Sequence, residues 1–253
     1  MRVLGIIPAR LESTRLPRKL LLRIGGKALL QHVWEAARRA RLLDRLVIAT
    51  DSLELERAAR DFGAEVERTS SKPRSGSERC AEVAQRLQAR VVINIQGDEF
   101  GVRPAMVDAL ARTLLDHPRL ALATLSQPLT RPRDWHDPAV VKVVTNRRGQ
   151  ALYFSRAPIP YGTGPTVRPG LRRHIGLYGY RRPALLNLAR RPPTPLEQLE
   201  GLEQLRALEN GWIIQVVPTR QRSEEINTWA DLRRVRRQRG RRAAHNLSTR
   251  RSR

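Results

Sequence analysis

The sequence predicts an α/β fold built on a mostly parallel, mixed β-sheet. Before residue 100, short apolar runs alternate with amphipathic helical patterns, and this βαβαβ order requires parallel strands joined by right-handed crossovers. In the second half, short strand-like runs follow one another without clear helices between them, which indicates some antiparallel pairing. At 253 residues the chain can bury a large core. We therefore expect one domain over residues 1–240 and a basic, disordered tail over residues 241–253.

The elements of the first half follow from apolar periodicity. Leu29, Leu30 and Val33 lie at spacings that give the first helix one apolar face, and Gly63 is typical of the end of the second helix. The predicted strands are residues 3–7, 45–50 and 91–95, and the predicted helices are residues 28–40, 53–62 and 77–88.

The elements of the second half are less regular, and clusters of proline near residues 158–170 and 192–195 mark loops. Runs rich in branched and aromatic residues predict the strands, and one apolar-periodic segment predicts a helix. The predicted strands are residues 120–125, 140–144, 177–180 and 213–217, and the predicted helix is residues 195–209.

The net charge of +24 is extreme and by itself would suggest a nucleic-acid partner. From Arg233 onward, however, the chain has ten arginines and no acidic residue, so much of the excess belongs to the tail. Aromatic residues make up only 4% of the chain, whereas single-strand binders interleave aromatic with basic side chains. Nucleic-acid binding through the tail remains the alternative of a different class. Truncation after about residue 240 separates it from an enzyme that does not need the tail.

The remaining composition excludes several classes. No apolar stretch reaches the roughly 18 residues needed to span a bilayer, and the N-terminus lacks the pattern of a signal peptide, so we expect a cytoplasmic protein without membrane insertion. The one cysteine, Cys80, has no partner for an intramolecular disulfide and no nearby set of zinc ligands. We interpret it as a buried residue without a chemical role.

Three cations follow the first predicted strand. Arg10, Arg15 and Lys19 stand in the segment PARLESTRLPRK at residues 8–19, and we expect the strand to stop near Pro8. In open α/β folds the carboxyl edge of the sheet is where ligands bind. Cations at this edge favour a ligand with several negative charges, such as a nucleoside triphosphate.

Two further segments carry polar chemistry. Asp98 follows the strand at residues 91–95, at the same expected edge, and can hold Mg²⁺ against phosphates, while Gly97 allows close approach of the backbone. The loop RSGSER at residues 74–79 precedes a predicted helix. Ser75 or Ser77 can cap that helix, and its N-terminus can also face a phosphate or a base.

These segments, with others further along, occur together and in order, and over residues 3–235 the chain closely resembles the 3-deoxy-manno-octulosonate cytidylyltransferases, or CMP-Kdo synthetases. Any one of the motifs can occur by chance, but the full ordered set is specific. The motifs are PAR..STRLP.K at 8–19, SG.ER at 75–79, N.QGDE at 94–99, AVVKVV at 139–144, ALYFSRAPIP at 151–160, RHIGLYGY at 173–180 and PLEQLEGLEQLR at 195–206.

The resemblance implies a three-layer, Rossmann-like nucleotidyltransferase fold, a Mg²⁺ cofactor and a homodimer. It also implies transfer of CMP from CTP to the anomeric hydroxyl of 3-deoxy-D-manno-octulosonate (Kdo), an in-line displacement that depends on positioning and charge neutralisation. Matching positions imply a catalytic set of Arg10, Lys19 and Asp98. They imply nucleotide contacts from Ala9, Arg10, Arg15, Lys19, Ser75 and Gln96, and sugar contacts from Gln96, Arg156, His174, Tyr178, Glu203 and Gln204. For His174, a structural hydrogen-bonding role is the alternative.

The chain departs from the family pattern at two positions. Asn227 stands where the family has an aspartate that supplies a second magnesium contact beside Asp98, and Phe100 stands where the family has proline. An amide oxygen still coordinates but carries no charge, so Asn227 is a weaker ligand, Glu225 compensates, or activity is reduced. Thr228 and Asp231 still predict a capping box for the following helix. Phe100 leaves open another acidic sugar, such as 8-amino-Kdo or a sialic-acid-like sugar.

Overall fold

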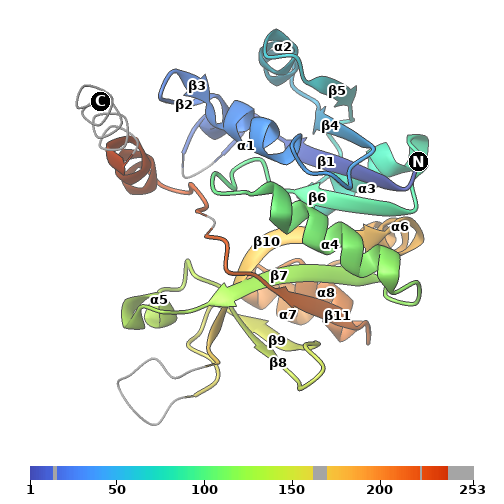
Figure 1. Cartoon of the computed structure of the whole chain (residues 1–253), viewed down its shortest axis with the longest axis vertical. Coiled ribbons are helices and arrows are strands. Elements are labelled where there is room, and N and C mark those ends of the chain that lie inside the picture. Colours follow the sequence, from blue (N-terminus) through green and yellow to red (C-terminus); the bar gives the residue numbers. More distant parts are fainter. Residues whose placement is uncertain (14–15, 162–169, 223, 239–253) are drawn as a thin grey trace, which may run out of the picture.

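The structure, a computed structural model, describes residues 1–13, 16–161, 170–222 and 224–238. Within these residues the central sheet has nine strands, ordered β11-β7-β10-β6-β1-β4-β5, with β8 pairing to β10 and β9 pairing to β8 (Figure 1). The strands are β1 (Val3–Ala9), β4 (Arg45–Thr50), β5 (Glu65–Arg68), β6 (Val91–Ile95), β7 (Leu122–Pro128), β8 (Lys142–Thr145), β9 (Ala151–Ser155), β10 (Arg172–Arg181) and β11 (Ile214–Pro218). A separate short hairpin joins β2 (Arg23–Ile24) to β3 (Lys27–Ala28).

The direction of the strands divides the sheet into two regions. β1 lies between β4 and β6 and is parallel to both, and β5 extends this parallel region beyond β4. β10 is antiparallel to β6 on one side and to β7 on the other, while β11 is parallel to β7. The predicted mostly parallel sheet, with antiparallel pairing in the second half of the chain, is therefore confirmed.

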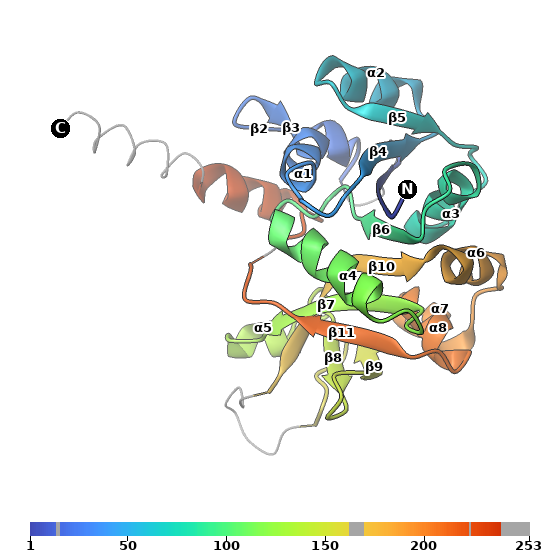
Figure 2. The same cartoon turned by 45° about the vertical axis from the view of Figure 1, so that its right-hand side comes forward.

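Helices cover both faces of the sheet, which gives three layers (Figure 2). One buried cluster packs the sheet against side chains of α1, α2 and α4, and the other packs it against α3, α6 and α8. The helices are α1 (Leu29–Ala37), α2 (Leu53–Asp61), α3 (Gly76–Arg86), α4 (Pro104–Asp116), α5 (Pro132–His136), α6 (Arg182–Arg190), α7 (Pro195–Glu200) and α8 (Gln204–Glu209), with a short 3-10 helix at Lys19–Leu21. Residues 229–238 are also helical, and Leu232 and Val235 join the first cluster.

The prediction of one helix over residues 195–209 was wrong. Gly201 has a left-handed backbone (φ 61°, ψ 41°) that ends α7, and α8 begins at Gln204. A glycine adopts this conformation without the steric penalty of a β-carbon. The break turns the chain, so that Glu203 lies at the N-terminal boundary of α8 and not in the middle of a continuous helix.

The first strand extends further than expected. Pro8 and Ala9 continue β1 by pairing with Ala49 and Thr50 of β4. A proline lacks an N–H for a ladder, but the pairing of β1 with β6 already ends at Ile6, so one side of the strand is unpaired there. The elements that the sequence interpretation missed are β5, α4, α5, β9, α6 and the β2–β3 hairpin.

Two expectations concern the rest of the chain. Cys80 is fully buried in α3, and burial raises the pKa of its thiol, as expected for a residue without a chemical role. Among the helices of the described residues, none is both long enough and apolar enough to cross a bilayer. The predicted tail at residues 241–253 lies outside the described residues.

Candidate active site

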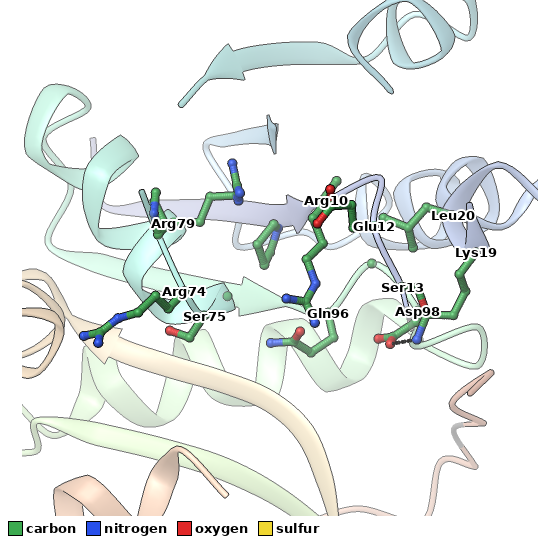
Figure 3. Close-up of a pocket in the computed structure, with 15 residues that line it drawn as sticks. Arg10, Glu12, Ser13, Lys19, Leu20, Arg74, Ser75, Arg79, Gln96 and Asp98 are labelled. Carbon is green, nitrogen blue, oxygen red and sulfur yellow. Dashed lines mark hydrogen bonds and ion pairs between the residues drawn. The ribbon is translucent and has the colours of Figure 1, made fainter. Parts of the chain in front are cut away.

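A pocket opens at the edge of the sheet where the parallel strands β1 and β6 end. Arg10 follows β1, Gln96 and Asp98 follow β6, and Ser75 precedes α3 (Figure 3). In Figure 3, Ser75 lies on one side of Gln96 and the pair Lys19–Asp98 on the other. The residues that line the pocket are Pro8, Ala9, Arg10, Glu12, Ser13, Lys19, Leu20, Pro73, Arg74, Ser75, Gly76, Arg79, Gln96, Gly97 and Asp98.

The N-terminus of α3 forms one wall of this pocket. Ser75 caps the helix, because its Oγ accepts a hydrogen bond from the backbone N–H of Glu78 at 3.1 Å. A β-carbon on Gly76 would lie 3.2 Å from Nε2 of Gln96 and 3.3 Å from Pro8, so a larger residue here would require one of these neighbours to shift by a few tenths of an ångström. The structure thus presents the positive end of a helix dipole beside Arg10 and Gln96.

Lys19, Asp98 and Asn227 meet at the other end of the pocket. Nζ of Lys19 forms an ion pair with Asp98 Oδ2 and donates a hydrogen bond to Asn227 Oδ1 at 3.1 Å. The chain reaches this point by pairing residue 225 with residue 99, and the N–H of Ile226 donates to Asp98 O at 3.1 Å. Two side-chain oxygens from distant parts of the chain therefore contact the ammonium group of Lys19.

Oxygen ligands of this kind suit Mg²⁺, which often takes only one or two protein ligands and keeps water or phosphate for the rest. Among the described residues, no group of three or more histidine, cysteine or acidic side chains is placed to hold a metal. The carboxylate of Asp98 and the amide oxygen of Asn227 are therefore a hard-oxygen pair, not a complete protein cage.

The helix that follows Asn227 begins with the predicted capping box. Asp231 Oδ2 accepts from the N–H of Thr228 at 3.0 Å, and Thr228 Oγ1 accepts from the N–H of Asp231 at 3.2 Å. The same carboxylate accepts from the N–H of Asn227 at 3.2 Å. This cap fixes the backbone at Asn227 although its side chain is no longer acidic.

The sugar-side residues of the prediction begin with two rings on β10. His174 and Tyr178 are both 8% exposed, and their ring centroids are 5.4 Å apart. His174 is also hydrogen bonded through Nε2 to Thr124 Oγ1 at 2.9 Å. Burial, with a smaller contribution from the charge of Arg173, lowers the pKa of His174 from 6.5 to about 3, so the ring is neutral near pH 7.

The next two predicted residues stand at the break between α7 and α8. Glu203 Oε1 accepts a hydrogen bond from Ser75 Oγ at 2.6 Å, and burial raises the pKa of the Glu203 carboxyl, opposed by that hydrogen bond. Gln204 is 5% exposed, and among the described residues its Nε2 has no hydrogen-bond partner. An unpartnered buried donor is costly to stability, which marks this atom as a candidate to bond a ligand or a water molecule.

Arg156 is held by backbone carbonyls. Its Nε donates to Glu200 O at 2.8 Å and its Nη1 donates to Pro138 O at 3.0 Å, so the guanidinium lies over the end of α7. Lys142 is fully buried next to Arg156 and donates hydrogen bonds to the carbonyl oxygens of Asp137 and Arg156. Desolvation lowers the pKa of Lys142.

Some pocket residues were not assigned from the sequence. Arg79 lies in the quoted motif at residues 75–79 but received no role; it is 5% exposed and pairs with Asp51 at 3.2 Å. Arg74 and Glu12 also line the pocket. Glu12 lies within the motif at residues 8–19 and Arg74 directly precedes the motif at residues 75–79, and these positions were the sequence signal that could have identified them. Arg15 lies outside the described residues.

Comparisons with known proteins identify the family of the chain. A cytidylyltransferase family model matches residues 4–226. The chain is 46% identical over 243 residues to the 3-deoxy-manno-octulosonate cytidylyltransferase of Syntrophotalea carbinolica, covering 93% of this chain and 97% of the relative. It is 44% identical over 245 residues to that of Geobacter sulfurreducens, covering 93% and 98%.

A solved structure of CMP:2-keto-3-deoxy-manno-octonic acid synthetase complexed with CTP is 37% identical and superimposes with a TM-score of 0.89, covering 96% of this chain and 100% of that one. The 4-diphosphocytidyl-2C-methyl-D-erythritol synthase of Anaerococcus prevotii, at 11% identity and a TM-score of 0.60, shares the fold alone. The match to the family model, the sequence identity to these relatives and the shared fold show that this chain belongs to the 3-deoxy-manno-octulosonate cytidylyltransferase family.

Proposed function

We propose that this protein transfers CMP from CTP to the anomeric hydroxyl of Kdo and releases pyrophosphate. The observation that carries the proposal is the meeting of Arg10, Lys19 and Asp98 at the carboxyl edge of β1 and β6, beside the N-terminus of α3. Cations and a helix N-terminus at one pocket fit a triphosphate. The comparisons support the same substrates, because the relatives are named for Kdo and the neighbouring structure holds CTP.

The chemistry follows from this arrangement. The anomeric hydroxyl oxygen of Kdo attacks the α-phosphorus of CTP and its proton is released to solvent, while the bond from that phosphorus to the bridging oxygen of the β-phosphate breaks and the electron pair leaves on pyrophosphate. Arg10 and Lys19 supply positive charge for the oxygens that gain negative charge, and Gln96 lies between the nucleotide wall and β10. Ala9 and the start of α3 present backbone groups to the nucleotide.

The residues present fit a magnesium ion. Asp98 and Asn227 would hold it, since both direct an oxygen at the position of the Lys19 ammonium. When bound, Mg²⁺ supplies neutralisation of phosphate charge. Asn227 gives this site one negative charge fewer than a pair of carboxylates, so we propose weaker metal binding with retained activity.

We propose that the sugar binds on the α3–α8 face of the sheet, next to the nucleotide pocket. Tyr178 belongs to the buried cluster on this face, and Gln204 has an unpartnered Nε2 that can donate to a hydroxyl or carboxylate of the sugar. Phe100, the departure from the family pattern, packs instead against His32 and the cluster on the opposite face, with ring centroids 5.3 Å apart. The departure at residue 100 therefore lies on the face of the sheet opposite the proposed sugar site. It gives no reason to prefer another acidic sugar over Kdo.

We further propose a homodimer that uses the edge near β9 and β11. Leu152 and Ile213 are 61% and 54% exposed, and both lie on the same side of the antiparallel bridge between Gln150 and Gln215, two residues from it on their respective segments. This places two exposed apolar side chains at neighbouring positions. Light scattering tests the proposal: we expect a dimer that Leu152→Glu converts to a monomer, and a monomeric unmodified protein would overturn it.

The test of function is pyrophosphate release from CTP and Mg²⁺ with Kdo, 8-amino-Kdo and a sialic acid offered in parallel. We expect release with Kdo and little with the others. A preference for 8-amino-Kdo or the sialic acid would reassign the sugar, and no release with any of the three would overturn the enzymatic proposal.

A further inference from the structure

Glu203, one of the predicted sugar-contacting residues, makes a hydrogen bond that sugar binding does not require. Its Oε1 accepts the hydroxyl hydrogen of Ser75 at 2.6 Å, across a separation of 128 residues. Ser75 is at the same time the cap of α3, where its Oγ accepts from the N–H of Glu78 at 3.1 Å. One serine hydroxyl therefore joins the N-terminus of the nucleotide-side helix to the start of α8.

This bonding leaves the Ser75 hydroxyl little to offer a nucleotide. Its hydrogen is directed at Glu203, and one oxygen lone pair is directed at Glu78. What the loop can still present to the pocket is its backbone N–H groups at the positive end of the helix dipole. Their positions depend on how firmly Ser75 is held.

The surroundings of Glu203 make it a rigid support. It precedes Gln204, Leu205 and Arg206, which are each 5% exposed or less. Arg206 is fixed in turn by an ion pair with Glu197 of α7 at 2.5 Å. On the far side of the loop, Ser77 Oγ is bonded to Tyr180 Oη at 3.2 Å and accepts from Asn94 at 3.3 Å. The start of α3 is thus held from α8 as well as from β6 and β10.

We propose that Glu203 is a positioning residue for the nucleotide: it holds Ser75, and through Ser75 the N-terminus of α3, in the conformation that binds CTP. The inference rests on the proposed function, since it assigns the nucleotide loop to CTP. It differs from a sugar-binding role in one measurable respect, because it requires Glu203 to influence CTP binding when no sugar is present.

The experiment measures the dissociation constant of CTP with Mg²⁺, without sugar, by isothermal titration calorimetry. We expect Glu203→Leu, which accepts no hydrogen bond, to raise the constant about tenfold, the effect of losing one hydrogen bond to a charged acceptor. Glu203→Gln, whose amide oxygen still accepts from Ser75, should remain within about threefold of the unmodified protein. Asp61→Asn, which changes an exposed carboxyl at the end of α2, is the control and should bind as the unmodified protein does.

A double-mutant cycle makes the test independent of any single variant. Ser75→Ala removes both the cap and the donor, so adding Glu203→Leu to it should weaken CTP binding much less than Glu203→Leu does alone, because only the contact of Glu203 with Ser77 is left to lose. Fully additive effects of the two changes, or unchanged CTP affinity in Glu203→Leu, would overturn the inference and leave the proposed function intact. Failure of the unmodified protein to bind CTP would overturn the proposed function itself, and the inference with it.

Discussion

The proposed nucleotide side and the proposed sugar side of the site are built in different ways. On the nucleotide side, Arg10 is exposed, and the side chains of Lys19 and Asp98 retain 13% and 19% of their accessible surface. On the sugar side, His174, Tyr178 and Gln204 are each 8% exposed or less and lie among rings and buried charges. Partly exposed charged side chains can give up their protein partners and bind phosphate or a metal ion at a small cost in free energy. The buried side chains of the proposed sugar side contribute to the stability of the fold as well as to sugar recognition.

The largest effect should come from the nucleotide side. Lys19→Met removes the cation that pairs with Asp98 and contacts Asn227, so we expect kcat/KM for CMP transfer to fall by about 10³-fold, as when a preorganised charge donor is lost. Pyrophosphate release measures it, and thermal unfolding should change little. Lys27→Met, which removes an exposed lysine paired with Glu35, is the control. Near-normal turnover in Lys19→Met would remove Lys19 from the catalytic set.

On the sugar side, the comparison predicts a loss of stability. Arg206 is 2% exposed, and Arg206→Met leaves its partner Glu197 without a counter-charge, so we expect the free energy of unfolding to fall by about 3 kcal/mol. Urea denaturation measures the change. Arg60→Met removes an arginine whose side chain is 62% exposed in its pair with Glu56, and should cost less than about 1 kcal/mol. Equal effects would contradict the distinction between the two sides.

The next effect depends on pH. His174 titrates near 6.5 when unfolded but at about 3 in the folded protein. The unfolded state therefore binds a proton first, and stability that is complete above pH 6.5 is lost as the pH falls toward 3. Between pH 7 and pH 5, His174 should account for about 2 kcal/mol of lost stability. Urea denaturation at pH 7 and at pH 5 measures the loss of unfolding free energy between the two, and this loss should be smaller by that amount in His174→Gln. An identical pH dependence in the two proteins would show that the histidine is not buried as described.

The smallest effect concerns the metal. Asn227→Asp adds a negative charge beside Asp98, so we expect the magnesium concentration for half-maximal rate to fall several-fold. Asn187→Asp adds the same charge at an exposed position of α6 and should leave that concentration unchanged. The same value in Asn227→Asp and the unmodified protein would mean that residue 227 does not contact the metal.

The parallel region could be predicted because its signals are local. Each apolar run of β1, β4 and β6 and each amphipathic helix is read from neighbouring residues. Parallel strands must also end at a common edge, so the sequence alone predicts that Arg10 and Asp98 lie close together. The prediction that Ser75 or Ser77 caps α3 was confirmed for Ser75 for the same reason. Helix α4 was missed although Pro104 at its start and the apolar face of the helix were legible.

The long-range contacts of the site could not be predicted to the same depth. The hydrogen bond between Ser75 and Glu203 spans 128 residues, and the contact between Lys19 and Asn227 spans 208. Such contacts depend on how short antiparallel strands are ordered in the sheet, which their sequences do not specify. The break at Gly201 was missed because the apolar pattern continues through it, although a glycine is typical of a helix end and was interpreted in that way at Gly63.

The return of the chain from β11 to Asp98 has a consequence for biosynthesis. The backbone of Ile226 and the side chain of Asn227 reach Asp98 and Lys19 only after nearly all of the described chain has been made. Truncated products that end before residue 225 can retain the residues of β1, β6 and the α3 loop, but they lack the side of the site that Ile226 and Asn227 supply.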